Sequence, residues 1–268
     1  YYRPGHADYT FDEKYGFRDY RGGGRSSGRE TIGRVAAGAI AEEVLKSLGI
    51  HVQAYTRSIG GIDIDETKAS LDNIMKSPLY MPDLDASEKA ELLLEQKMKE
   101  QDSAGGVIEC VVRGMPAGIG EPVFEKLDAN LAKAVMSIGA VKGVEIGDGF
   151  AVASAFGSDN NDSFVAAENG SIAKKTNHAG GILGGMSDGS DIILRAAVKP
   201  TPSIARKQQT VNRDGEDIEI SIKGRHDPVI VPRAVVVVEA MSAFCVLDMV
   251  LLGMTSRLDK IQEFWKRQ

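Results

Sequence analysis

The chain has 268 residues, of which 43% are hydrophobic, enough for a sizeable core in one large domain or two small ones. Its net charge of −6 argues against a nucleic-acid partner, because proteins that bind nucleic acids usually present a strongly basic face. Basic residues gather instead in one segment, where Arg18, Arg21, Arg25, Arg29 and Arg34 outnumber two acidic residues. This segment predicts a site for a small anion rather than for a polymer.

Apolar spacing predicts helices and strands that do not alternate regularly, which favours an α+β fold over a doubly wound sheet. In chain order we expect a helix from residue 27 to Gly49, a strand at 51–56, a helix at about 86–101, a strand at 106–115, a helix at about 123–138, strands at 141–147, 149–157 and 191–200, a hairpin over 210–222 and a buried helix from residue 232. Residues 157–177 are polar and Asn-rich, which is typical of a flexible insertion.

The longest apolar run, 234–247, contains Glu239 and is followed by Asp248, so we expect it to be too short and too charged to span a membrane. Cys110 and Cys245 lie in apolar runs without CxxC spacing and are predicted to be buried, reduced thiols, without a metal. The chain begins without Met and without the apolar character of a signal peptide, so we expect a truncated N-terminus and a cytoplasmic protein.

Residues 20–31 read YRGGGRSSGRET and suggest a phosphate site. Ser27 and Glu30 have capping-box spacing, so a helix would begin there, with its free amides between Arg25 and Arg29. An ordinary capped helix with solvated arginines explains the same residues equally well. The sequence has neither a G-x-G-x-x-G pattern nor a Walker A loop, so a Rossmann or P-loop nucleotide site is unsupported.

Two stretches near the ends of the chain carry candidate proton-handling groups. In RPGHAD, His6 stands beside Arg3 and Asp8 and could be kept protonated near neutral pH as an acid or an anion partner; a structural histidine is the more common alternative. In GRHDP, Asp227 follows two basic residues and could serve as a base, or simply form a salt bridge in a turn.

Two further stretches offer ligand contacts. KPTPSI sets Lys199, Thr201 and Ser203 on a rigid extended segment, which suits a phosphate or the edge of a heterocycle, although a plain sheet-edge loop fits as well. NHAGGILGG has four glycines around a short apolar core, which permits close approach of the backbone to a ligand.

These four stretches, with YGFRDYRGGGRSSGRET and AVKGVEIGDGF, resemble chorismate synthase from Tyr2 to about Leu252. The resemblance implies a β-α-β sandwich with a helical core between sheets and a single domain over residues 1–268, lacking the family's N-terminal segment with its GESHG-like motif. It implies conversion of 5-enolpyruvylshikimate-3-phosphate (EPSP) to chorismate by 1,4-anti elimination of phosphate and a proton. Reduced FMN would be required although the reaction is redox-neutral, and the enzyme would be a cytoplasmic homotetramer.

The resemblance also assigns roles to residues. His6 and Asp227 would handle protons around the flavin as catalytic residues. Substrate-binding residues would be Arg3, Ser27, Arg29 and Arg225. Flavin-binding residues would be Arg25, Ser26, Ser27, Gly139, Ala140, Gly184, Lys199, Pro200, Thr201, Pro202, Ser203 and Arg225. Many members carry Asn where this chain has Gly139, so only backbone contacts are expected from that position.

Two alternatives remain open at this point. A non-catalytic relic would bind flavin or phosphate without turnover, although such a module would have no need of both His6 and Asp227. A bifunctional enzyme would also reduce its flavin with NADPH, but no separate NADPH-binding motif is visible.

Overall fold

A computed structural model describes residues 1–21, 24–167, 170–222, 224 and 227–266. The chain forms two compact units, each built from three segments of sequence. Unit 1 consists of Tyr1–Ile32, Tyr55–Ile108 and Ala197–Val235, and unit 2 of Gly33–Ala54, Glu109–Ala196 and Val236–Gln268. The single domain expected over residues 1–268 stays a prediction.

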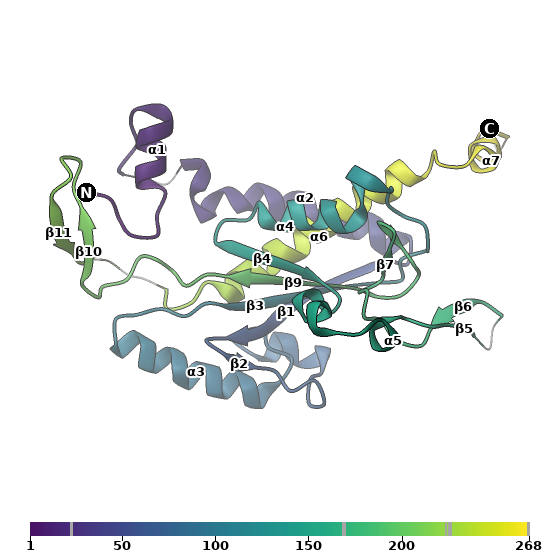
Figure 1. The fold of residues 1–268 in the computed structure, drawn as a ribbon, viewed down its shortest axis with the longest axis horizontal. Helices are drawn as coiled ribbons and strands as arrows, with labels where there is room; N and C mark the ends of the chain where they lie inside the picture. Colours follow the sequence, from purple (N-terminus) through teal and green to yellow (C-terminus); the bar gives the residue numbers. More distant parts are fainter. Residues whose placement is uncertain (22–23, 168–169, 223, 225–226, 267–268) are drawn as a thin grey trace. The chain divides into compact units, whose positions relative to one another are not determined.

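The elements combine helices, 3-10 turns (η) and strands (Figure 1), and the predicted α+β class is confirmed. Unit 1 contains α1 Asp8–Tyr15, η1 Gly24–Ser26, η2 Gly28–Glu30, β2 Ile62–Asp63, η3 Leu71–Lys76, α3 Leu84–Lys99, β10 Gln208–Val211 and β11 Asp217–Ile220. Unit 2 contains η4 Val123–Glu125, α4 Leu127–Met136, β4 Val141–Ile146, η5 Gly149–Ser154, α5 Gly157–Asn160, β5 Phe164–Ala166, β6 Ile172–Lys174, β7 Ile182–Leu183, β8 Met186–Ser187 and α7 Leu258–Lys266. Elements with residues in both units are α2 Thr31–Ser47, β1 His51–Ile59, β3 Gly106–Arg113, β9 Ile192–Val198 and α6 Val231–Gly253.

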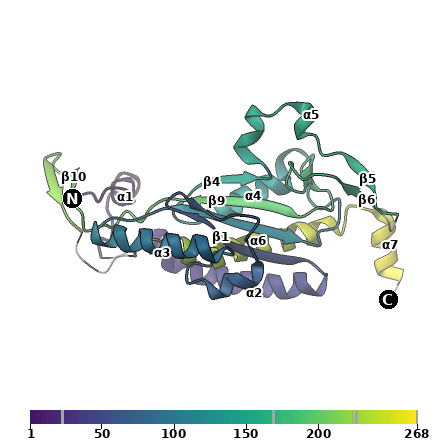
Figure 2. The same ribbon diagram turned by 90° about the horizontal axis from the view of Figure 1, so that it is seen from below.

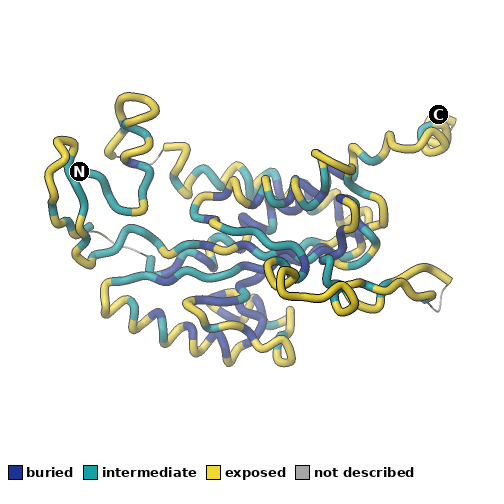
Figure 3. Tube along the Cα trace, in the orientation of Figure 1, coloured by how far each residue is buried: buried dark blue, intermediate teal, exposed yellow. Residues whose placement is uncertain are grey.

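The main sheet has five strands in the order β2-β1-β3-β9-β4. Strand β3 is buried at five consecutive positions, as expected of a strand covered on both faces, whereas β9 alternates buried and partly exposed residues. Where strand and helix residues of unit 2 meet, they form a core that includes Leu45, Val112, Leu131, Ile192 and Val246. Figure 3 shows this burial as dark blue along the strands and the inner sides of the helices.

Most predicted elements are present, with shifted ends. The helix expected at 86–101 begins at Leu84, because the Asp83 carboxylate accepts from the amides of Asp85 and Ala86 and caps it. The helix expected at 123–138 is shorter, α4, and Phe124, near the start of the expected helix, is 89% exposed in η4. The strand expected at 149–157 is wrong: the chain forms η5 and α5 there.

The helix predicted from residue 232 is confirmed as α6, but it is longer than its apolar run suggested. It spans 23 residues, and its most apolar 18-residue stretch has a mean hydropathy of 2.3, so by length and composition alone it could cross a membrane, and the length argument made from the sequence is wrong. Half of its most apolar stretch is buried. Gly38 of α2 lets this helix approach closely, since a Cβ at Gly38 would lie 2.3 Å from that of Ala240.

Residues 157–177, predicted to be a flexible insertion, contain α5 and the β5–β6 hairpin, apart from residues 168 and 169. The Lys174 ammonium lies 2.6 Å from the Asp188 carboxylate and 3.2 Å from that of Asp162. All three side chains are at most 6% exposed. Asp162 also accepts from the backbone amides of His178 and Ala179, so paired charges hold the base of this segment.

Hairpin β10–β11 is confirmed and lies beside the N-terminal segment of unit 1 (Figures 1 and 2). The Tyr2 amide donates to the Val211 carbonyl, and the Thr210 hydroxyl donates to the Tyr2 carbonyl. Asp12 of α1 accepts from Arg213 at 2.7 Å, which ties α1 to the same hairpin. The segment that carries His6 is therefore anchored on both sides.

Candidate active site

His6 is placed by a tight turn over residues 3–6. The His6 amide donates to the Arg3 carbonyl at 3.2 Å, Pro4 fixes φ at the second position, and Gly5 has the positive φ, 71°, that a type II turn requires at the third. The sequence RPGH thus builds the turn locally.

Both ring nitrogens of His6 have partners. Nδ1 lies 3.1 Å from the Pro4 carbonyl oxygen, and Nε2 lies 2.8 Å from the Ser203 hydroxyl. A carbonyl only accepts, so Nδ1 carries the hydrogen, and in the neutral ring Nε2 accepts from Ser203. Burial, reinforced by nearby cations, lowers the pKa of His6, and this outweighs the opposing hydrogen bond to Pro4. The expectation of a protonated His6 is wrong for the chain without ligands.

The carboxylate expected to support a protonated His6 is instead held by an arginine. The Arg3 guanidinium donates to both oxygens of Asp8, at 2.8 Å from Nε and 2.7 Å from Nη2, and the Arg3 amide donates to the same carboxylate at 3.0 Å. Burial opposes ionisation, but these hydrogen bonds override it and lower the pKa of Asp8 to about 2. Asp8 therefore orients Arg3, whose side chain stays 33% exposed.

The KPTPSI segment packs against this turn. The Lys199 ammonium donates to the Gly5 carbonyl at 2.7 Å, and a Cβ at Gly5 would lie only 2.8 Å from the Cβ of Pro202. The Ser103 hydroxyl donates to the Thr201 carbonyl at 2.7 Å and supports the segment from behind. In the part of the chain that the structure describes, the buried Thr201 hydroxyl oxygen has no hydrogen-bond partner. Buried polar atoms without a partner are few in folded proteins, and this hydroxyl is one of four such side-chain atoms among the described residues.

Asp227 lies at a pocket of about 150 Å³ in unit 1. The pocket is lined by Met98, Gln101, Asp102, Ser203, Ile204, Ala205, Gly224, Asp227 and Pro228. Ser203 thus belongs to the pocket and also contacts His6. Asp227 forms a salt bridge, at 2.7 and 3.0 Å, but its partner is Arg233 at the start of α6, outside the GRHDP stretch.

The arginine-rich loop is only partly as predicted. The Ser27 hydroxyl accepts from the Arg29 amide at 3.3 Å, while the Glu30 amide donates to the Ser27 carbonyl, so two 3-10 turns precede α2 and the predicted capping box is wrong. Arg25, Ser26 and Arg29 are exposed. Arg225, predicted to bind both substrate and flavin, lies outside the described residues.

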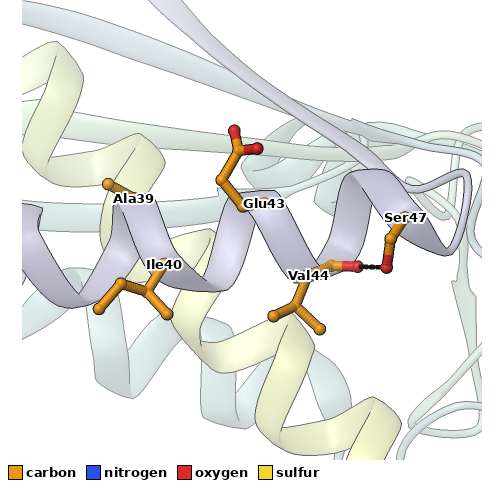
Figure 4. Close-up of a pocket in the computed structure, with 5 residues that line it drawn as sticks. All are labelled: Ala39, Ile40, Glu43, Val44 and Ser47. Carbon is orange, nitrogen blue, oxygen red and sulfur yellow. Dashed lines mark hydrogen bonds between the residues drawn. The ribbon is translucent and has the colours of Figure 1, made fainter.

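The other predicted flavin-binding positions lie in unit 2. Gly139 and Ala140 link α4 to β4, and Ala140 has a φ of 74°, an uncommon conformation for a residue with a Cβ. Gly184 opens the two-glycine turn between β7 and β8 with a φ of 61°. A larger, shallow hollow in this unit, about 570 Å³, runs along the outer side of α2 and contains none of the predicted site residues (Figure 4).

The comparisons with known proteins point to one family. The family model for chorismate synthase matches residues 1–251. The chorismate synthase of Lachnoclostridium phytofermentans is 66% identical over 267 residues, which is 100% of this chain and 73% of that protein. The chain belongs to the chorismate synthase family.

More distant members show the same likeness. The chorismate synthase of Archaeoglobus fulgidus is 56% identical over 254 residues, covering 94% of this chain and 70% of that protein. A crystal structure of chorismate synthase superimposes with a TM-score of 0.78 at 29% identity, covering 97% of this chain and 75% of the other. Chorismate synthases are lyases, and this chain is an enzyme of that class.

Sequence reasoning missed two residues that support the candidate site. Ser103 holds Thr201, and Arg233 pairs with Asp227. Arg233 could have been found, because it stands six residues after Asp227, just past a predicted helix start. Ser103 could not, because only the fold brings it to a segment 98 positions away.

Proposed function

We propose that the chain converts EPSP to chorismate and phosphate by 1,4-anti elimination, with reduced FMN as the cofactor. The observation that carries the proposal is the meeting of two motifs that stand far apart in the sequence. His6 contacts Ser203, 197 positions away, and Lys199 contacts the Gly5 carbonyl. Family membership supports the substrate and the product.

The 199–203 segment fits a flavin nucleotide. Thr201 presents a buried hydroxyl without a partner in the described part of the chain, Lys199 a cation, and Ser203 a second hydroxyl. We propose that these groups hold FMN together with the exposed Arg25 and Ser26. When bound, reduced FMN would lend electron density transiently to the allylic system of the substrate, which eases cleavage of the C–O bond to phosphate.

The residues of the chain would orient the substrate and manage protons. EPSP carries a phosphate and two carboxylates, and Arg3, Ser27, Arg29 and Arg225 are proposed to bind them. The Asp8 carboxylate accepts hydrogen bonds from two nitrogens of the Arg3 guanidinium. These two bonds fix the direction in which the guanidinium faces an anion. Cations therefore dominate the proposed substrate site although the protein is acidic.

His6 and Asp227 take the two proton-handling roles. Because His6 has a lowered pKa, its imidazolium form is a ready proton donor toward an anionic ligand. Asp227 offers a carboxylate at the pocket that Ser203 also lines, within a salt bridge to Arg233. A carboxylate so placed can accept a proton once a ligand fills the pocket.

The test is single-turnover kinetics under anaerobic conditions with EPSP and chemically reduced FMN. His6→Ala and Asp227→Ala should each slow turnover by about 10²- to 10⁴-fold, the usual effect of losing a general acid or base, while ligand affinities fall much less. His51→Ala, which alters an exposed histidine in unit 2, serves as the control. Wild-type turnover in a folded, flavin-bound His6 variant would refute its role. Binding of both ligands without turnover by the unaltered protein would support the non-catalytic module instead.

We further propose that the protein is a cytoplasmic homotetramer, because family membership favours that location and assembly. We also propose that it prefers FMN to FAD, because its loops suit a single phosphate group. Light scattering tests the assembly, and a fluorescence titration with EPSP present tests the flavin preference. Turnover driven by NADPH and oxidised FMN, without another reductant, would identify a bifunctional enzyme.

A further inference from the structure

The contacts of His6 suggest how a partly buried imidazole can change its protonation state. Nδ1 donates to the Pro4 carbonyl, and this contact is the same whether the ring is neutral or charged. Nε2 differs, since it is an acceptor in the neutral ring and a donor in the imidazolium. Its partner must therefore be able both to donate and to accept.

We propose that the Ser203 hydroxyl is a reversible hydrogen-bond partner of His6, donating to Nε2 of the neutral ring and accepting from Nε2–H of the imidazolium. A hydroxyl has one donor hydrogen and two lone pairs, so rotation about its C–O bond suffices. The 2.8 Å separation suits both directions. Ser203 is then a positioning residue, and the inference rests on the proposed proton-handling role of His6.

The neighbours of His6 show why this partner matters. Arg3 in the turn and Lys199 in the opposing segment disfavour a positive charge on the His6 ring. Asp8 of α1 favours that charge, although its carboxylate is paired with Arg3. Burial adds to the cost of the imidazolium. An Nε2–H left without an acceptor would make the charged form costlier still.

The decisive measurement is a pH titration of the His6 ring by NMR, on ligand-free protein labelled with ¹⁵N at histidine. Ser203→Ala should lower the pKa of His6 by about one unit, because the hydrogen bond to the charged ring is about twice as strong as that to the neutral ring. Ser203→Thr keeps the hydroxyl and should restore the wild-type pKa. His6→Gln identifies the signals.

Ser103→Ala is the matched control, because it removes a hydroxyl that supports the same segment without touching His6. It should leave the pKa of His6 unchanged. An unchanged or raised pKa in Ser203→Ala would overturn the proposal, and so would an equal shift in Ser103→Ala. The titration needs no substrate or flavin, so a failure of the proposed lyase activity would show separately, as absent turnover in a protein whose His6 still titrates as expected.

Discussion

Gly5→Ala tests whether the tight turn holds the two motifs together. Gly5 has a φ of 71°, and a Cβ there would lie 2.8 Å from the Cβ of Pro202. Gly16, at the end of α1, has a φ of 77° with nothing within 4 Å of its added Cβ, so Gly16→Ala isolates the backbone cost. That cost is about 1–2 kcal/mol for an L-residue in the left-handed region.

The contact with Pro202 should raise the cost at Gly5. Forcing an atom into a filled space adds about 1–3 kcal/mol, so Gly5→Ala should lower the free energy of unfolding by about 2–5 kcal/mol in total. Urea unfolding measures both variants, and Pro202→Gly combined with Gly5→Ala should recover part of the loss. Equal destabilisation of the Gly5 and Gly16 variants would refute the reasoning, since the predicted contact would then carry no energy.

Three other predictions concern buried or bridging charges. Lys199→Ala should weaken FMN binding by about 1–3 kcal/mol in a fluorescence titration, whereas Lys207→Ala, which alters a 76% exposed lysine, should not. Lys174→Met leaves two buried carboxylates without their cation and should cost about 3–5 kcal/mol in urea unfolding, in contrast to Lys175→Met at an exposed neighbour. Burial raises the pKa of Glu239 from 4.5 to about 7, so the folded state binds its proton more tightly and the free energy of unfolding should fall as pH rises through this window. Glu239→Gln should remove that fall, as urea midpoints at several pH values will show.

The sequence was sufficient to predict a structural element where the residues that cause it to form are close together in the chain. Alternation of Ile218 and Ile220 around an Asp-Gly turn predicts a hairpin that the structure contains. Apolar periodicity alone was not sufficient around Phe150 and Phe156, which are 83% and 75% exposed in a stretch that reads as a strand. An apolar run forms a strand only where a neighbouring strand or a core covers it, and the sequence does not show which runs are covered.

In the candidate site, too, some features could be predicted from the sequence and others could not. Family resemblance assigned His6 and the 199–203 segment to one site, and the structure joins them. Family resemblance did not reveal that Arg3 and His6 compete for the single carboxylate of Asp8. The carboxylate pairs with the Arg3 guanidinium, which donates to both of its oxygens. Burial, more than this competition, lowers the pKa of His6 and opposes the protonated state that the sequence suggested.

The two cysteines make the chain convenient for site-directed labelling. Burial raises the pKa of both thiols to about 12, so almost no thiolate exists at neutral pH, and maleimides, which react with the thiolate, find little to attack. A cysteine introduced at an exposed position such as Tyr20, which is 80% exposed, should therefore take up a fluorophore selectively, without prior removal of native cysteines. The arginine-rich loop can then be followed by fluorescence as ligands arrive.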